Sequence, residues 1–174
     1  MHFHVLGRPV TTPTIMQVGP DRVDHLQELW KSLHAHHAVV GPHLGPLLPP
    51  DESWVRMRRQ YLEWFEKADA FALLAEADGR PIGYAFVYVR VGSTTWALAE
   101  RTAELATLAV LPEERSHGVG RALMAAMFDE LRRRSIQDWR VSVLKTNVDA
   151  IRFYERLGVI PTVESFIGRV PDPV

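Results

Sequence analysis

The amino-acid sequence predicts a mixed α/β (α+β) fold, and two observations support this prediction. Apolar runs typical of strands are interleaved with stretches of helical spacing, in the order β-α-α-β-β-β-α-β-α-β. One strand–helix–strand crossover follows a predicted hairpin, as in mixed sheets. The chain has 174 residues, a length that favours one domain with a single core.

The first part of the chain predicts one strand and two helices. Residues 1–12 show no period and are expected to form an N-terminal arm, and Thr14–Val18 is a short strand candidate. The turn at Gly19–Asp21 then supplies capping chemistry for a helix. Its apolar face consists of Val23, Leu26, Leu29, Trp30 and Leu33. Gly41–Pro50 holds six Gly or Pro and predicts a loop, after which a second helix begins near Asp51. The stripe of this helix is Trp54, Met57, Tyr61, Trp64 and Phe65.

The second part predicts a hairpin followed by a crossover. Ala70–Ala77 and Pro81–Val91 are strand candidates, and the Asp78-Gly79 pair between them is typical of a hairpin turn. The later expected elements are the connection Gly92–Arg101, the strand Thr102–Leu111, the glycine loop Arg115–Gly120, the helix Arg121–Arg134, the strand Trp139–Leu144, the helix Val148–Leu157 with Asn147 as its N-cap and Gly158 as its stop, and the strand Thr162–Gly168.

Composition narrows the function classes. The formal net charge is −1, without the basic excess of a nucleic-acid-binding protein. The chain has no cysteine, which excludes a disulfide framework, a thiol nucleophile and a zinc–thiolate site. Its apolar stretches are far shorter than the roughly 20 residues that span a bilayer. The N-terminal residues lack the pattern of a signal peptide, so we expect a cytoplasmic protein with no membrane partner.

A glycine pair after the strand Thr102–Leu111 predicts an anion site. The first N–H groups of a helix lack internal partners, and Gly118 and Gly120 let a diphosphate approach them closely. Arg115 and Arg121 flank the loop and add positive charge. A P-loop is disfavoured because no Gly-Lys-Ser/Thr follows, and a dinucleotide fingerprint because Leu123 stands where its third glycine belongs. A plain glycine turn remains the alternative.

Two motifs resemble those of the GNAT (Gcn5-related N-acetyltransferase) superfamily. The first is Arg115-x-x-Gly118-x-Gly120, preceded by Leu108-Ala109-Val110-x-Pro112 and followed by Arg121-Ala122-Leu123-Met124. The second is Asn147-x-x-Ala150-x-x-Phe153-Tyr154-x-x-x-Gly158. Both occur in the family's order and spacing. One departure is Val159, where the family often has phenylalanine after the glycine.

The resemblance implies a single domain over residues 13–174, with a mixed, mostly antiparallel sheet that is flanked by helices and split between its fourth and fifth strands. It implies acetyl-CoA in that split, with the pantetheine arm along the backbone of Leu108 and Val110 and the pyrophosphate on the glycine loop. The residues expected to bind acetyl-CoA are Leu108, Ala109, Val110, Arg115, Ser116, His117, Gly118, Val119, Gly120, Arg121, Asn147 and Tyr154. The resemblance implies no metal, and a homodimer is a family-level expectation.

By the same resemblance, the activity is acetyl transfer to a primary amine of a small molecule or peptide, by direct attack in a ternary complex. Glu104 is the candidate base, because alternation puts it on one strand face with Ala106 and Leu108. A solvated strand-end carboxylate is the alternative. Tyr154 is the candidate acid, since a phenol is protonated at neutral pH, and simple packing is its alternative. The contrasting function is a catalytically silent domain that binds CoA as a sensor or structural ligand.

The resemblance implies that the acceptor binds to the first two helices, their connection and the loop before the central strand. Its candidates are His34, His37, Trp54 and Trp96. His34 and His37 are three residues apart on one helix, but no further ligands are fixed, so a metal site is disfavoured. Charges in this region are mixed and do not indicate the acceptor.

Overall fold

The computed structural model describes residues 12–96 and 99–168. The arm expected at residues 1–12 therefore lies outside the described residues apart from Thr12, and its boundary stays a prediction. The chain divides into two compact units, Met1–Ser142 and Val143–Val174, which are described separately. Within the described ranges, no helix is both long and apolar enough to cross a membrane.

The first unit is built on a five-stranded sheet with the order β1-β2-β3-β4-β5. Its strands are β1 (Thr14–Val18), β2 (Ala70–Ala77), β3 (Arg80–Val91), β4 (Arg101–Val110) and β5 (Asp138–Val141). All neighbours are antiparallel except β4 and β5, which confirms the predicted mixed, mostly antiparallel sheet. Asp78 and Gly79 both have positive φ, 52° and 73°, as the hairpin turn between β2 and β3 requires.

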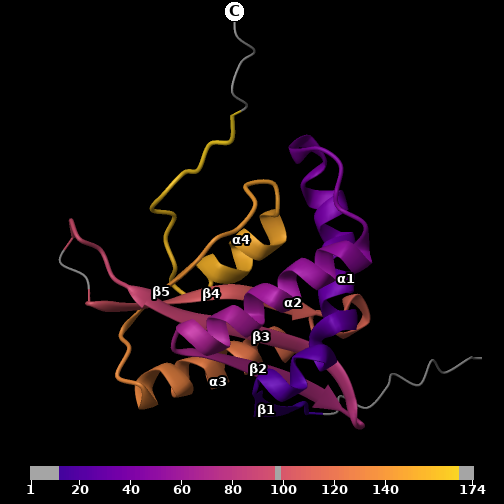
Figure 1. The fold of residues 1–174 in the computed structure, drawn as a ribbon, viewed down its shortest axis with the longest axis horizontal. Helices are drawn as coiled ribbons and strands as arrows, with labels where there is room; N and C mark the ends of the chain where they lie inside the picture. Colours follow the sequence, from indigo (N-terminus) through magenta and orange to yellow (C-terminus); the bar gives the residue numbers. More distant parts are fainter. Residues whose placement is uncertain (1–11, 97–98, 169–174) are drawn as a thin grey trace, which may run out of the picture. The chain divides into compact units, whose positions relative to one another are not determined.

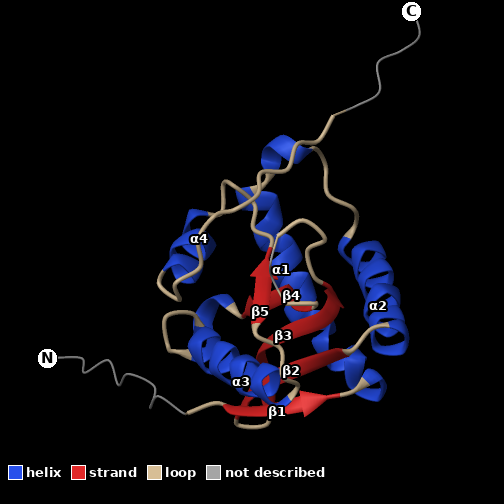
Figure 2. Cartoon of the chain, turned by 90° about the vertical axis from the view of Figure 1, so that its left-hand side faces the viewer, coloured by secondary structure: helices blue, strands red, loops and turns tan. Residues whose placement is uncertain are grey.

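Helices cover both faces of this sheet (Figures 1 and 2). The predicted first helix begins as a 3₁₀ segment (Pro20–Leu26) and continues as α1 (Gln27–Val40). Together with α2 (Pro50–Lys67) it encloses the main core. On the other face, α3 (Val119–Arg133) lies against β2, β3 and β4. The largest fully buried side chains include Tyr61, Tyr84, Phe71 and Phe86.

A bulge in β4 changes which residues share a face. Phe86 of β3 pairs with Thr107, whereas the next residue, Val87, pairs with Leu105, so Ala106 is an extra residue in β4. Glu104 and Thr107 consequently point to the side of α1 and α2, while Leu108 pairs with Ala85 on the opposite face. The expectation that strict alternation groups Glu104 with Leu108 is therefore wrong.

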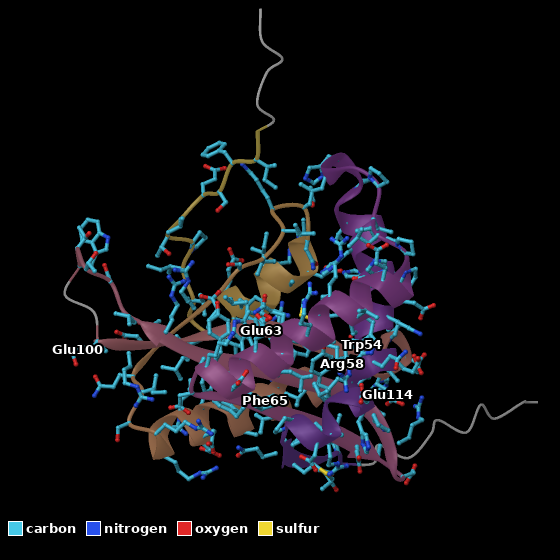
Figure 3. All side chains as sticks on the ribbon, viewed as in Figure 1. Trp54, Arg58, Glu63, Phe65, Glu100 and Glu114 are labelled. Atoms are coloured by element: carbon cyan, nitrogen blue, oxygen red, sulfur yellow. The ribbon has the colours of Figure 1, made fainter. Side chains whose placement is uncertain are left out.

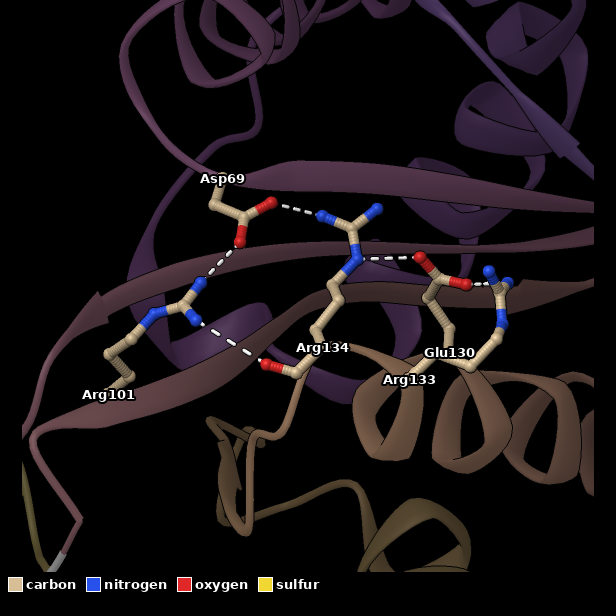
Figure 4. Close-up of polar contacts among 5 residues, drawn as sticks. All are labelled: Asp69, Arg101, Glu130, Arg133 and Arg134. Carbon is tan, nitrogen blue, oxygen red and sulfur yellow. Dashed lines mark hydrogen bonds and ion pairs between the residues drawn. The ribbon is translucent and has the colours of Figure 1, made fainter.

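The end of α3 is tied to the sheet by charged groups (Figure 4). Arg134 pairs with Asp69 and, through Nε, with Oε1 of buried Glu130 at 2.6 Å. Arg133 also pairs with Glu130, and Arg101 with Asp69. The Arg134 guanidinium lies over the Phe71 ring at 4.7 Å. These contacts anchor the helix that follows the glycine loop.

The second unit contains α4 (Val148–Glu155). Asn147 caps it by accepting a hydrogen bond from the backbone of Ala150 at 3.3 Å, and Gly158 follows it with a φ of +83°. Both positions were predicted. The strand expected at Thr162–Gly168 is wrong, because this segment pairs with no strand among the described residues and its side chains are exposed. β propensity describes a fit to a neighbouring, half-buried sheet, and the segment has no such neighbour.

Candidate active site

The loop between β4 and α3 leads into backbone N–H groups that make no hydrogen bond inside the helix. The first hydrogen bond within α3 runs from the backbone N–H of Ala122 to the carbonyl of Gly118, at 2.9 Å. The N–H groups of Val119, Gly120 and Arg121 precede it and have no acceptor inside the helix. Gly118 has a φ of +87°, and a Cβ there would meet no atom within 4 Å. This open, partly positive helix start has the geometry of an anion site.

Arginines set the charge around this loop. Arg115 donates from Nε to the carbonyl of Val110 at 3.2 Å, which joins the loop to the end of β4. Arg80 pairs with Glu113 at 3.2 Å and with Glu114 at 2.8 Å (Figure 3 labels Glu114). These pairs offset the two carboxylates that precede the loop. Ser116, His117 and Arg121 are exposed, so a ligand can reach their side chains.

The end of β4 leads into this loop without support from β5. The two strands pair only from Thr102 to Leu105, opposite Asp138 to Val141. Leu108, Ala109 and Val110 lie beyond that pairing, as the predicted split between the fourth and fifth strands requires. An extended ligand can pair with such a strand edge by adding to the sheet. The predicted strand Trp139–Leu144 is thus shorter than expected, as β5 ends at Val141.

Glu104 is a buried ion-paired carboxylate, with only 7% of its surface exposed. Its Oε2 lies 2.9 Å from Nε of Arg140 on β5 and 3.6 Å from a guanidinium nitrogen of Arg90 on β3. Tyr88 stands opposite Glu104 in the register. Burial first, and then the charge of Glu104, raise the pKa of Tyr88. The alternative of a solvated carboxylate at a strand end does not fit this burial.

The second unit, described by itself, contains Asn147 and Tyr154. Asn147 uses its side-chain oxygen to cap α4. Tyr154 is buried, and burial raises its pKa, so its phenol keeps its hydrogen over the whole neutral range. Their predicted roles toward acetyl-CoA stay predictions.

The four acceptor-side candidates have different surroundings. His34 is buried, and its Nε2 makes no hydrogen bond with the described residues. His37 packs edge-on against Trp30 at 6.5 Å, and burial lowers its pKa. Trp54 lies in the core, on α2 (Figure 3), whereas Trp96 is 72% exposed on the connection before β4. The structure therefore does not bring the two tryptophans together.

Sequence reasoning missed the partners of Glu104. Arg90 and Arg140 lie on strands that flank β4, and only the strand register brings them to the carboxylate. No sequence motif marks them. Across residues 12–96 and 99–168, no group of three or more His, Cys, Asp or Glu side chains could hold a metal ion.

Sequence comparisons give the same family for most of the chain. The model of the acetyltransferase (GNAT) family matches residues 30–159. The mycothiol acetyltransferase of Thermobispora bispora is 32% identical over 160 residues, which cover 88% of this chain and 52% of that protein. The mycothiol acetyltransferase of Acidothermus cellulolyticus is 31% identical, with 86% and 46% covered. The chain thus spans about half the length of these relatives.

Solved structures share the fold. The GCN5-related N-acetyltransferase of Ralstonia eutropha superposes with a TM-score of 0.72 at 19% identity, over 91% of this chain and 99% of that one. The aminoglycoside N-acetyltransferase AAC(6')-Iy, solved in complex with CoA, gives 0.67 at 20% identity, over 92% and 95%. At these identities the similarity concerns the fold alone.

Proposed function

Because the chain belongs to the GNAT family of acetyltransferases, as its two motifs predict, we propose that it transfers an acetyl group from acetyl-CoA to a primary amine of a small molecule. The observation that carries the proposal is the continuity of one segment: the β4 edge at Leu108–Val110, which has no pairing with β5, runs through the glycine loop into the first N–H groups of α3, at Val119–Arg121, which have no acceptor inside the helix. An extended arm and an attached diphosphate are the two chemical features that such a continuous surface fits.

Acetyl-CoA, when bound, supplies a thioester whose acetyl carbon forms a bond to the acceptor nitrogen as the carbon–sulfur bond breaks. In this proposal Glu104 takes the proton of the acceptor ammonium, directly or through one water. Backbone N–H groups of β4 near Val110 polarise the thioester oxygen. Tyr154 is protonated at neutral pH because burial raises its pKa, and in this proposal its phenol is the group that gives a proton to the departing thiolate. The Asn147 side chain would contact the pantetheine arm, directly or through a bridging water.

A small-molecule acceptor is favoured by the names of the relatives. Mycothiol acetyltransferase and aminoglycoside N-acetyltransferase are both named for small molecules. A ribosomal-protein-alanine N-acetyltransferase also shares the fold, so a peptide amine belongs in any test. The second candidate function is a silent CoA-binding domain, which the two guanidinium groups on Glu104 favour because they engage the proposed base.

The test measures CoA binding and thiol release separately. Calorimetry with CoA should show binding to the wild-type chain and none to Gly120→Leu, whose side chain would stand among the loop donors. Ala125→Leu, an exposed change on the same helix, is the matched control and should bind normally. Release of free thiol from acetyl-CoA is then measured with mycothiol-related amines, aminoglycosides and peptides. A wild-type chain without affinity for CoA overturns the proposal, and binding without turnover on any amine favours the silent domain.

A further inference from the structure

Three hydroxyl groups meet in the core directly behind the bulge of β4. The Tyr61 hydroxyl, from α2, lies 2.6 Å from Oγ1 of Thr107 and 3.0 Å from the hydroxyl of Tyr84. All three side chains are buried, with exposures of 0%, 4% and 0% for Tyr61, Thr107 and Tyr84. Tyr61 is the central member, because it is hydrogen-bonded to both of the others.

Tyr61 also contacts the strand pair next to the bulge through its ring. The ring stacks on Phe86 with a centroid distance of 4.0 Å and an interplanar angle of 8°. Phe86 is the residue opposite Thr107 in the β3–β4 register. One side chain of α2 therefore holds both members of the first pair beyond Ala106.

Apolar packing alone would not distinguish the bulged register from a shifted one. A shift by one residue moves every side chain of a strand to the other face. In β4 such a shift would turn Thr107 away from α2 and put an apolar neighbour, Ala106 or Leu108, in its place. Tyr61 would then lose a buried hydrogen-bond partner, which would leave one of the two tyrosine hydroxyls without an acceptor, and unpaired buried hydroxyls are costly. The three hydroxyls thus favour one register over its neighbours.

The register matters because β4 leaves β5 at this point. Beyond Leu105 the strand has no pairing with β5, and the bulge decides which residues turn their backbone groups to that edge. These are the groups of Leu108–Val110 to which the proposed function assigns the pantetheine arm. A shifted register would turn the backbone groups of Ala109 to this edge and those of Leu108 and Val110 toward β3.

We propose that Tyr61, Tyr84 and Thr107 are positioning residues that hold the register of β4, and so decide which backbone groups are presented to the pantetheine arm of CoA. The inference rests on the proposed function, and it assigns specificity for the arm to side chains that do not touch the ligand. The anion site at the start of α3 consists of N–H groups of the helix, at Val119–Arg121, and not of groups of β4. Binding of the arm and binding of the phosphates are therefore separable.

The experiment compares CoA with 3′-phosphoadenosine 5′-diphosphate, which keeps the pyrophosphate and lacks the arm. Thr107→Val keeps the shape of the side chain and removes its hydroxyl, and Thr107→Ser keeps the hydroxyl. We expect Thr107→Val to raise the Kd for CoA about tenfold and leave that for the nucleotide without the arm within about twofold, a difference of about 1.4 kcal/mol. Thr107→Ser should bind both like the wild type. Equal affinity of Thr107→Val and wild type for CoA overturns the inference.

A triple variant separates positioning from core stability. Tyr61→Phe, Tyr84→Phe and Thr107→Val together leave none of the three hydroxyls unpaired, so thermal stability should recover relative to Tyr61→Phe alone. We expect its β4 amides from Thr107 to Val110 to exchange hydrogen about tenfold faster than in the wild type, and those of β2 at the wild-type rate. Wild-type exchange in β4 overturns the inference even if the wild-type chain fails to bind CoA, an outcome that refutes the proposed function on its own.

Discussion

Replacing Gly83 with alanine should push the end of β4 away from β3 and weaken the binding of CoA. Gly83 pairs with Val110 at the point where β4 ends. A Cβ at this position would lie 2.8 Å from the carbonyl oxygen of Ala109 and 3.3 Å from methyl carbons of both Val110 and Val119. Val119 is the first residue of α3, so the added methyl would press on both sides of the glycine loop.

The size of the effect follows from these distances. The contact with Ala109 falls about 0.6 Å short of the 3.4 Å at which ordinary van der Waals contact begins. The obstructing atom belongs to the backbone and cannot rotate away, so the strand itself must shift. Overpacking of this kind costs about 1–3 kcal/mol, and the stiffer unfolded chain returns about 0.4–1 kcal/mol of it. The net loss of roughly 1–2 kcal/mol lowers the Tm by roughly 2–8 °C in a domain of this size.

The assay pairs thermal unfolding with calorimetric titration of CoA. Gly45→Ala is the matched control, because Gly45 has a φ of +99° and open space around its Cβ position. Its backbone strain costs about 1–3 kcal/mol, in the connection between α1 and α2, which pairs with neither β3 nor β4. Gly83→Ala should raise the Kd for CoA about tenfold, and Gly45→Ala should leave it unchanged. Equal CoA affinities in the two variants would refute the reasoning.

Three further predictions concern the proposed chemistry and the buried tyrosines. Glu104→Gln should lower kcat in the thiol-release assay about 10²–10⁴-fold with an unchanged Kd for CoA, whereas a near-wild-type kcat/KM places the base elsewhere. Tyr154→Phe should lower kcat by a factor in the same range, whereas an unchanged kcat means that the Tyr154 ring contributes packing alone. Burial raises the pKa of both Tyr61 and Tyr84, so above about pH 10 the unfolded chain releases protons that the folded chain retains. The free energy of unfolding in urea should therefore be insensitive to these groups below about pH 10 and fall above it, less steeply in Tyr61→Phe, and an unchanged slope in that variant contradicts this.

Features that depend on neighbouring residues were predictable from the sequence. The Asp78-Gly79 turn, the Asn147 cap and the Gly158 stop are each determined by side chains within a few positions, and the structure has all three. The two glycines of the loop are likewise a local pattern. Such features could be predicted because their hydrogen bonds close within a single turn of chain.

Residues and segments whose role depends on tertiary contacts were harder to assign from the sequence pattern. Trp54 was a pocket candidate and lies in the core, since an aromatic stripe on a helix looks the same in either setting. The β-branched and aromatic residues of Thr162–Gly168 are typical of a strand, but a strand forms only where another strand accepts its backbone hydrogen bonds.

The sequence by itself determined the order of the elements as far as α4, the family and the position of the glycine loop, because periodicity and short motifs are written in consecutive residues. Only the tertiary structure decided that Ala106 is a bulge, that Tyr61 reaches Thr107 across 46 positions, and that Arg140 and Arg90 enclose Glu104. These contacts depend on strand register, which is a property of strand pairing and not of any run of consecutive residues. The same sequence paired in a register shifted by one residue would form a different site.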